Sequence, residues 1–591
     1  MTAGTEAVVT GMAWATPLGD GLQEVWRRLC SGATGVADQP SPHRLRTERA
    51  AAVPSPPYRP GGREAWERQV ALAARTMDAA LRDAGVAADH GRLTLVPGTS
   101  FDARIDREAP EEDWAVAAAR QLGHPRRPLV VTTACSAGAD SLLLALALLR
   151  EGGGEGIFLA GGVDVLTEAK RLGHSALGTM SPTGLRAFDV AHDGMTLGEG
   201  AGFLVLEGAA AARRRGARVY ATLSGAGSAN DAFGLTAPDP SGRTVTAAVR
   251  RALAGSGGVP GDVAVICAHG TGTPANDEVE AATVQRLFGG VRSGPVPVVF
   301  GTKGALGHSL GATGAIEAVA TVLALRERQV PPLHGLSSPL PGLSLRLPRG
   351  GPEKAYGTRG ISLTLGFGGF NTCLLFDSGP PAGDAGDGAA TAVPAGPASD
   401  PPLAVAGHAT LRVTDPASHT RDKPSFYADP VAWLIVSAVE EALAPCREEA
   451  LAEPDEVAVL VTHDGQALPT HRRIARDAAR GRVSPLRFAG SNPGILAGLT
   501  CLTLGLRGPS LVLEADPADA GNAGTALVGD WLRTGRARYV LWAAHRADGD
   551  AHTATCVVLR PGTPDDDGAD GAGFARQLLT DPPTADAVQR P

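Results

Sequence analysis

The turn that organises this chain lies in the stretch VVTTACSAGADSLLLALALLREG, residues 130–152. A second stretch, LEADPADAGNAGTALVGDWLRTG, residues 513–535, aligns with it without a gap and shares several alanine, glycine, leucine and arginine positions. Cys135 of the first stretch is matched by Ala518 of the second. One chain therefore carries a cysteine-bearing turn and a cysteine-free version of the same turn.

The composition bounds the class of protein. With 591 residues, 43% of them hydrophobic, the chain can form about two to four domains. Its formal net charge of −8 argues against a nucleic-acid partner. The seven cysteines form no CxxC pair, which favours a reducing compartment over a disulfide framework or a zinc knuckle. Neither a signal peptide nor a run apolar enough to span a bilayer is recognised, so we expect a cytoplasmic protein without a membrane partner.

Two segments of biased composition divide the chain. Residues 377–402, DSGPPAGDAGDGAATAVPAGPASDPP, contain too little apolar surface to fold and are predicted to be a flexible linker. Residues 561–591 have the same character and are predicted to be a disordered tail. The predicted folded domains are therefore residues 1–376 and residues 403–560.

Residues 1–376 alternate short β-branched or apolar runs with helical stretches, which is typical of a layered α/β fold. The stretch 138–151 is apolar on every face, so this helix is expected to be central and buried. The predicted strands are 7–13, 93–98, 129–134, 156–162, 202–208, 263–270 and 361–369, and the predicted helices are 65–84, 138–151, 243–254, 277–288 and 312–327.

Residues 403–560 repeat the first part of this pattern and then end. LAVAGHATL is similar to AVVTGMAWATPLG, and DPVAWLIVSAVEEALAPC is similar to ERQVALAARTMDAALRDAG. Next come VAVLVTHDG, the cysteine-free turn and YVLWAAHRAD. They correspond, in the same order, to LTLVPGTSF, the cysteine-bearing turn and IFLAGGVDV of the first domain. The second domain is thus predicted to be a partial internal duplication.

Three residues have the chemistry of a reactive site. Cys135 ends a strand and begins a helix, where free N–H groups and the helix dipole are expected to lower the pKa of a thiol and make it nucleophilic. His269 lies in AHGTGTP and His308 in GTKGALGHSLGATGAIE, both Gly-rich turns that let the backbone approach a ligand. A structural core cysteine and a metal site are the alternatives, but the spacing matches no common zinc signature, so no metal is predicted.

In this order, TTACSAG, AHGTGTP and TKGALGHSLGATG resemble the three catalytic motifs of the β-ketoacyl-acyl carrier protein synthases, the ketosynthases of the thiolase superfamily. MSPTGLRAFDVAHDGMTLGEGAGFLVLE, residues 180–207, and GFGGFNTCLLF, residues 366–376, resemble connecting motifs of that family. The resemblance covers most of residues 1–376. It implies a thiolase-like layered fold (αβαβα) of two related halves, followed here by an additional half-thiolase-like α/β domain.

The resemblance also implies a decarboxylative Claisen condensation in polyketide or specialised fatty-acyl biosynthesis. Cys135 would take an acyl group from the phosphopantetheine thioester of an acyl carrier protein, and no bound cofactor is expected. His269 and His308 would then bind the carbonyl of a malonyl-type thioester and stabilise the enolate that forms when carbon dioxide leaves.

Further residues match supporting positions of the family. The backbone N–H groups of Cys135 and Phe367 would form the oxyanion hole, and Phe367 would also gate the acyl pocket. Thr271 and Thr273 would hydrogen-bond the pantetheine arm.

A charged pair is implied behind the second histidine. Lys303 and Glu317 match the pair that supports this histidine in the family without reacting itself. The alternative is an ordinary solvated lysine and an ordinary helix glutamate.

The first domain departs from the family in one loop. Between LVPGTS and the nucleophile it spends about 34 residues, 99–133, whereas the second domain spends roughly 20 more, 463–516. In the family this loop lines the acyl pocket and the dimer contact. The departure leaves acyl-chain length and ordinary homodimerisation open.

The second domain could replace a dimer partner. A half-repeat that exposes a hydrophobic strand edge needs a cover. We therefore expect strand 510–516 to lie antiparallel beside strand 128–133 and to form an intramolecular pseudo-dimer. A homodimer, or a second domain that is a separate carrier-protein or partner-docking module, is the alternative.

Two other functions stay open. A non-elongating acyltransferase would use the same Cys135 acyl-enzyme, although the intact His269 and His308 favour decarboxylation. A non-catalytic partner similar to chain-length-factor subunits would typically lack the nucleophile. That function is disfavoured for residues 1–376 and favoured for residues 403–560.

Overall fold

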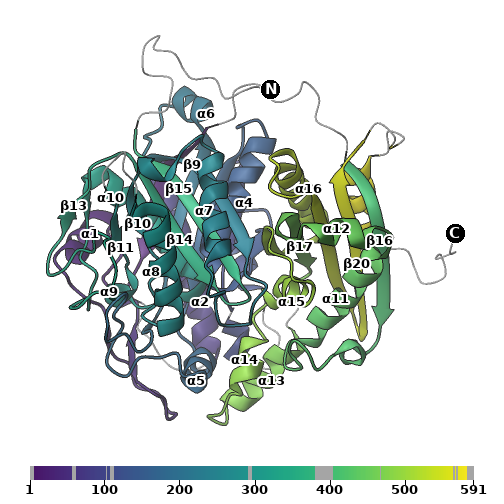
Figure 1. Cartoon of the computed structure of the whole chain (residues 1–591), viewed down its shortest axis with the longest axis horizontal. Coiled ribbons are helices and arrows are strands. Elements are labelled where there is room, and N and C mark those ends of the chain that lie inside the picture. Colours follow the sequence, from purple (N-terminus) through teal and green to yellow (C-terminus); the bar gives the residue numbers. More distant parts are fainter. Residues whose placement is uncertain are drawn as a thin grey trace.

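The structure is a computed structural model that describes residues 6–55, 62–101, 103–106, 112–290, 296–379, 403–465, 468–563, 566 and 570–581. We call residues 6–379 the N-terminal unit and residues 403–581 the C-terminal unit; they lie side by side, coloured purple to teal and green to yellow (Figure 1). Most of the predicted linker, 380–402, lies outside the described residues.

Ten strands of the N-terminal unit form two groups that correspond to the two predicted halves. In sheet order, the first group is β5 (Val130–Val131), β4 (Leu93–Gly98), β6 (Ile157–Asp164), β8 (Gly200–Gly208) and β1 (Ala7–Ala15). The second group is β9 (Ala221–Asn230), β15 (Phe370–Asp377), β14 (Arg359–Gly366), β10 (Val263–Cys267) and β11 (Val298–Phe300). β1 and β9 pair and join the groups.

Helices separate and cover these two groups of strands. α4 (Ala137–Glu151) and α10 (Thr313–Glu327) pack on each other and contact strands of both groups. α2 (Gly62–Ala84) covers β1, β6 and β8, and α7 (Arg243–Ala254) covers β9 and β15. Nearly every residue of α4 is buried, as its uniformly apolar sequence predicted. The order helix, sheet, helices, sheet, helix is the predicted αβαβα arrangement.

The remaining elements of the N-terminal unit are short or peripheral. They are α1 (Leu22–Cys30), β2 (Ala37–Asp38), β3 (Arg49–Ala51), α3 (Trp114–Leu122), α5 (Glu168–Ala176), β7 (Leu197–Gly198), α6 (Ala209–Arg214), α8 (Pro274–Phe288), α9 (Lys303–Leu306), β12 (Gln329–Val330) and β13 (Glu353–Lys354). Three 3-10 turns matter for the site: η1 (Ala103–Asp106), η2 (Ala134–Ser136) and η4 (Leu310–Ala312).

The C-terminal unit repeats the first group of strands. Its sheet order is β18 (Ser510–Glu514), β17 (Val457–His463), β19 (Tyr539–Asp548), β20 (Ala551–Pro561) and β16 (Leu403–Val413). Parallel and antiparallel pairings follow those of β5, β4, β6, β8 and β1 one for one. The register shift between Val9 and Gly11 of β1 recurs between Val405 and Gly407 of β16. Both glycines approach a helix backbone too closely for a side chain.

The helices of the C-terminal unit follow the same plan. α11 (Pro430–Leu443) packs on β16, β19 and β20, much as α2 packs on the first group of strands. α16 (Pro517–Arg533) begins at the cysteine-free turn, in the place of α4. The loop between β17 and β18 forms α13 (Pro469–Ala478), α14 (Pro485–Ala489) and α15 (Ile495–Leu504), and α12 is Arg447–Ala452.

The two units join through one pair of strands. β18 runs antiparallel to β5, with Leu513 opposite Val131 and Glu514 opposite Val130. The N–H of Thr132 donates to the carbonyl of Val512 at 3.1 Å. The strands expected at this junction therefore meet in the expected direction, over a shorter stretch, and one sheet of fifteen strands crosses the described parts of both units.

The prediction of a disordered tail was wrong for residues 571–580. They form α17 (Gly571–Thr580), which packs on α16, β16 and β20. Ala575 and Leu579 are buried and lie four residues apart, on one face of the helix. The acidic, Gly-rich sequence before them hid this short amphipathic pattern. In the N-terminal unit, α10 of the second half packs on α4. The sequence of the C-terminal unit repeats only the first half, and α17 is the helix that packs on α16 there.

Candidate active site

The nucleophile turn is a strained and buried connection. η2 links β5 to α4, and Ala134 at its start has a φ of +53°, an unusual value for a residue with a side chain. Cys135 is only 7% exposed. The hydroxyl of Ser136 donates to the carbonyl of Phe370 at 2.9 Å and holds the turn against β15. η2 also contacts β14 and η4, the turn that follows His308.

The thiol of Cys135 is not acidified in this structure. Burial raises the pKa of Cys135 to about 12 and outweighs the opposing influence of the Lys303 charge and of hydrogen bonds from the backbone of Phe367 and of Cys135 itself. The lower pKa expected from the helix N-terminus is therefore wrong, because a turn buried between two sheets loses more hydration than the dipole replaces. Backbone hydrogen bonds from Phe367 and from Cys135 itself reach the thiol, and the oxyanion hole that these two N–H groups would form for an acyl carbonyl stays a prediction.

The two histidines come together as a pair. His269 follows β10 and His308 follows α9, and their ring centroids lie 5.3 Å apart at an interplanar angle of 85°. Each is 2% exposed. Burial, reinforced by the positive charge of Lys303, lowers the pKa of both imidazoles far below the usual value, so both rings are neutral.

The surroundings of His308 fix where its proton lies. The N–H of Leu310 donates to Nδ1 at 3.2 Å, and Oγ1 of Thr313 lies 2.9 Å from the same nitrogen. A backbone N–H can only donate, so Nδ1 is an acceptor and the neutral ring carries its proton on Nε2. His308 is thereby prepared to donate a hydrogen bond from Nε2.

Two acidic residues that the sequence analysis missed hold the His269 turn. Glu280 accepts the N–H groups of His269 at 2.6 Å and of Gly270 at 2.7 Å, and Asp277 accepts that of Gly272 at 3.1 Å. Burial raises the pKa of Glu280 to about 7. Both carboxyl groups belong to α8 and are three residues apart directly after AHGTGTP, a spacing that places them on one helix face. This spacing in the sequence could have predicted that the two carboxyl groups face the His269 turn.

The predicted supporting residues also meet. Nζ of Lys303 lies 2.9 and 3.0 Å from the two carboxylate oxygens of Glu317, and both side chains are almost fully buried. This is a buried ion pair and not the solvated pair considered as an alternative. The hydroxyl groups of Thr271 and Thr273 lie 2.8 Å apart.

A row of aromatic rings connects the predicted gate to the C-terminal unit. The ring of Phe367 lies 5.9 Å from that of His174, and His174 meets the edge of Phe488 at 5.1 Å. Phe488 then stacks on Phe101 at 5.1 Å. Phe488 belongs to α14, so the long loop of the second domain lies beside the gate, although the sequence did not single out this residue.

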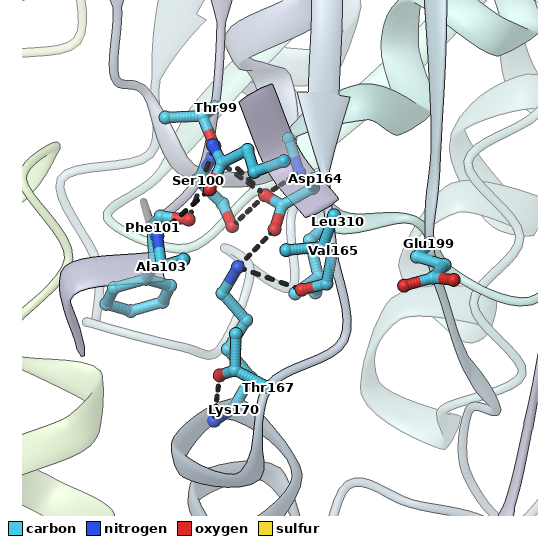
Figure 2. A network of polar contacts seen from close by, with 12 residues as sticks. Thr99, Ser100, Phe101, Ala103, Asp164, Val165, Thr167, Lys170, Glu199 and Leu310 are labelled. Atoms are coloured by element: carbon cyan, nitrogen blue, oxygen red, sulfur yellow. Dashed lines mark hydrogen bonds and ion pairs between the residues drawn. The ribbon is translucent and has the colours of Figure 1, made fainter. Parts of the chain in front are cut away.

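A buried polar network surrounds Asp164, the last residue of β6 (Figure 2). Oδ2 of Asp164 accepts the N–H and the hydroxyl of Ser100 at 2.9 and 2.5 Å, and Nζ of Lys170 donates to Oδ1. Asp164 and Lys170 are both fully buried. Nothing in the spacing of VDVLTEAK indicated this ion pair.

Among the described residues, no group of three or more histidine, cysteine, aspartate or glutamate side chains could hold a metal ion. Within the same ranges no helix is long and apolar enough to cross a bilayer.

Comparison with known proteins places the chain in a family. Residues 5–212 match the model of the beta-ketoacyl synthase N-terminal domain, and residues 220–337 match that of the C-terminal domain. Together the two matches cover more than half of the chain. The chain belongs to the β-ketoacyl synthase family. This confirms the predicted ketosynthase resemblance and the predicted acyl-transferring, condensing class of enzyme.

Individual relatives agree with the family. The chain is 32% identical over 431 residues to the mitochondrial 3-oxoacyl-acyl-carrier-protein synthase of Arabidopsis thaliana, which covers 63% of the chain and 93% of that relative. It is 35% identical over 252 residues to the 3-oxoacyl-acyl-carrier-protein synthase 2 of Mycobacterium tuberculosis, covering 41% of the chain. That match spans 59% of the mycobacterial protein. The cytoplasmic location stays a prediction.

Solved structures resemble the chain over different lengths. The match to the PfaC ketosynthase–chain length factor covers 95% of the chain and 79% of that protein, at a TM-score of 0.74. At 17% sequence identity, this match establishes the fold alone. The ishigamide ketosynthase/chain length factor covers 64% of the chain at a TM-score of 0.57 and 27% identity, with all of its own length matched. The thiolase-like fold predicted from the sequence is thereby confirmed.

Proposed function

We propose that this ketosynthase catalyses decarboxylative condensation of an acyl group on Cys135 with a malonyl-type thioester carried by an acyl carrier protein. The observation that carries the proposal is the pairing of His269 and His308, two buried and neutral imidazoles with rings 5.3 Å apart. Neutral imidazoles donate to a developing oxyanion without first losing a proton. Nε2 of His308 carries the donor that this role needs.

Acyl transfer would take place at the nucleophile turn. Sγ of Cys135 attacks the carbonyl carbon of the carrier thioester, the pantetheine thiol leaves, and the thiol proton goes to the departing sulfur. The backbone N–H groups of Cys135 and Phe367 stabilise the tetrahedral oxyanion. Because the resting thiol holds its proton, the positive charge of Lys303 is the influence that most favours its removal.

Carbon–carbon bond formation would follow at the same site. The malonyl carbonyl oxygen accepts hydrogen bonds from His269 and His308, carbon dioxide leaves, and the resulting enolate carbon attacks the acyl carbonyl on Cys135. The bond between that carbonyl carbon and Sγ then breaks, the Cys135 thiolate leaves and takes up a proton from solvent, and the β-ketoacyl product remains on the carrier protein. Thr271 and Thr273 would hold the pantetheine arm that presents the malonyl group. The reaction needs no bound cofactor or metal.

The C-terminal unit would act as the partner half of an intramolecular pseudo-dimer. Strand β18 occupies the edge of β5, and α16 packs beside α4. Nδ2 of Asn230 donates to Oγ of Ser510 at 3.0 Å, and Arg104 donates to the carbonyl of Gly465 at 2.9 Å. We propose residues 1–376 as the catalytic domain and residues 403–560, extended by α17, as a non-catalytic wall and interface.

Mass spectrometry of the intact protein tests the proposed activity. The chain is incubated with a panel of acyl-carrier thioesters, and the acylated residue is mapped by peptide analysis. Acylation of Cys135, followed by product formation with malonyl-carrier protein, is expected. Acyl groups that appear on another residue, or that never extend, would overturn the assignment.

A further inference from the structure

One polar side chain of the C-terminal unit is buried where the two units meet. Asn492, between α14 and α15, is 4% exposed. Its Nδ2 donates to the carbonyl of Ser100 at 2.7 Å, and its Oδ1 accepts the N–H of Gly494 at 2.8 Å. A carbonyl only accepts and a backbone N–H only donates, so these two partners fix the orientation of the amide.

Ser100, which accepts this hydrogen bond, also contacts Asp164. Figure 2 shows Ser100 and Asp164 facing each other at the ends of their strands, with Leu310 close by. Oδ2 of Asp164 accepts both the N–H and the hydroxyl of Ser100. The same oxygen accepts the N–H of Gly311 at 3.1 Å. One carboxylate oxygen therefore joins Ser100 to the turn that follows His308.

The backbones of Ser100 and Gly311 are in direct contact. A Cβ atom on Gly311 would lie 2.2 Å from the backbone nitrogen of Ser100, so no side chain can stand between them. Leu310, the residue whose N–H holds Nδ1 of His308, has a φ of +46°. A residue with a side chain keeps this conformation only where its surroundings impose it. A shift of Ser100 would thus reach the hydrogen bond that orients His308.

We propose that Asn492 is a positioning residue for His308, acting through Ser100 and Asp164. The C-terminal unit then does more than cover a strand edge, because it sets the donor that stabilises the enolate. The inference rests on the proposed function, since it concerns the decarboxylation step of that reaction.

Asn492→Asp isolates this contact. The aspartate keeps an oxygen acceptor for Gly494 but replaces the donor to Ser100 with an oxygen that repels its carbonyl. Decarboxylation of malonyl-carrier protein and acylation of Cys135 are measured separately. We expect decarboxylation to fall about tenfold, since small misplacements of catalytic groups are costly, while acylation changes by less than about twofold.

The matched control is Thr555→Val. Thr555 of β20 is 2% exposed and its hydroxyl lies 3.1 Å from that of Thr410 on β16, so the variant removes a buried polar contact on the far strands of the C-terminal unit. Both rates should match those of the wild type. If Asn492→Asp fails to fold, Asn492→Ala is compared with the control in the same way.

The outcomes separate this inference from the proposed function. A wild-type protein that neither acylates nor decarboxylates would overturn the proposed function itself. With an active wild type, an equal loss of both rates in the Asn492 variants would make the residue merely structural and overturn the inference. Unchanged rates would overturn it as well.

Discussion

Leu513 of the C-terminal unit is paired with Val131, four residues before Cys135, the proposed nucleophile. The edge of β5, which would otherwise be open to a second chain, is filled from within the same chain. The cysteine-free turn that follows β18 carries Ala518 where the first turn carries Cys135. In the second copy the strand before the turn therefore makes the contact between the units, and in the first copy the turn carries the proposed nucleophile.

The two half-reactions should separate by mutation. Cys135→Ala should abolish the acyl-enzyme yet leave measurable decarboxylation of malonyl-carrier protein, because the histidines form the enolate site. His269→Ala or His308→Ala should lower decarboxylation on the order of 100-fold, the usual cost of one lost oxyanion donor, while Cys135 still acylates. Release of carbon dioxide and intact mass report the two steps. Normal decarboxylation in the histidine variants would show that the mechanism is wrong.

Lys303 should control the nucleophile through its charge. Its positive charge is the largest influence that lowers the pKa of the Cys135 thiol, so Lys303→Met should slow acylation at pH 7 by about tenfold or more.

The single change also leaves Glu317 buried without a partner, which destabilises the fold. The double variant Lys303→Met/Glu317→Leu removes both charges and serves as the control for folding. It should unfold at a temperature closer to that of the wild type but acylate as slowly as the single variant. Acylation of the double variant at the wild-type rate would contradict the assigned role.

His174 should make the fold sensitive to acid. Burial lowers the pKa of His174 to about 3, against about 6.5 in an unfolded chain. Below pH 6.5 His174 is protonated in the unfolded chain but stays neutral in the folded chain. The free energy of unfolding is therefore full above this pH and decreases as the pH falls. Between pH 7 and pH 5 this one group accounts for a loss of about 2 kcal/mol in the free energy of unfolding.

His174→Gln removes that titration. Urea unfolding at pH 7 and pH 5 should show that the variant loses about 2 kcal/mol less stability over this interval than the wild type. Identical losses in the two proteins would mean that His174 takes up its proton in the folded state.

The order of the motifs and the helix pattern made most of the fold predictable. The stretch 138–151 is apolar on every face, and only a central position buries all of it. AHGTGTP and TKGALGHSLGATG each follow a strand, which brought His269 and His308 to one edge of the second half. The cysteine-free turn at Ala518 revealed the duplication.

Side-chain contacts between distant segments were not predictable. Asp164 and Lys170 are ordinary charged residues in sequence, and only folding shows that they are buried together. Asn492 meets Ser100 across 392 positions of the chain. The pKa of Cys135 was misjudged for a related reason, because the helix N-terminus is visible in the sequence whereas the depth of burial is not.

The oligomeric state of the active protein tests the central claim that the chain contains its own partner half. Light scattering on the full-length protein, with condensing activity measured across the same eluted peak, gives mass and function together. We predict a monomer near the chain mass of 60.1 kDa that carries the full activity, because β18 already occupies the edge of β5. A species of twice that mass, with activity confined to it, would contradict the account.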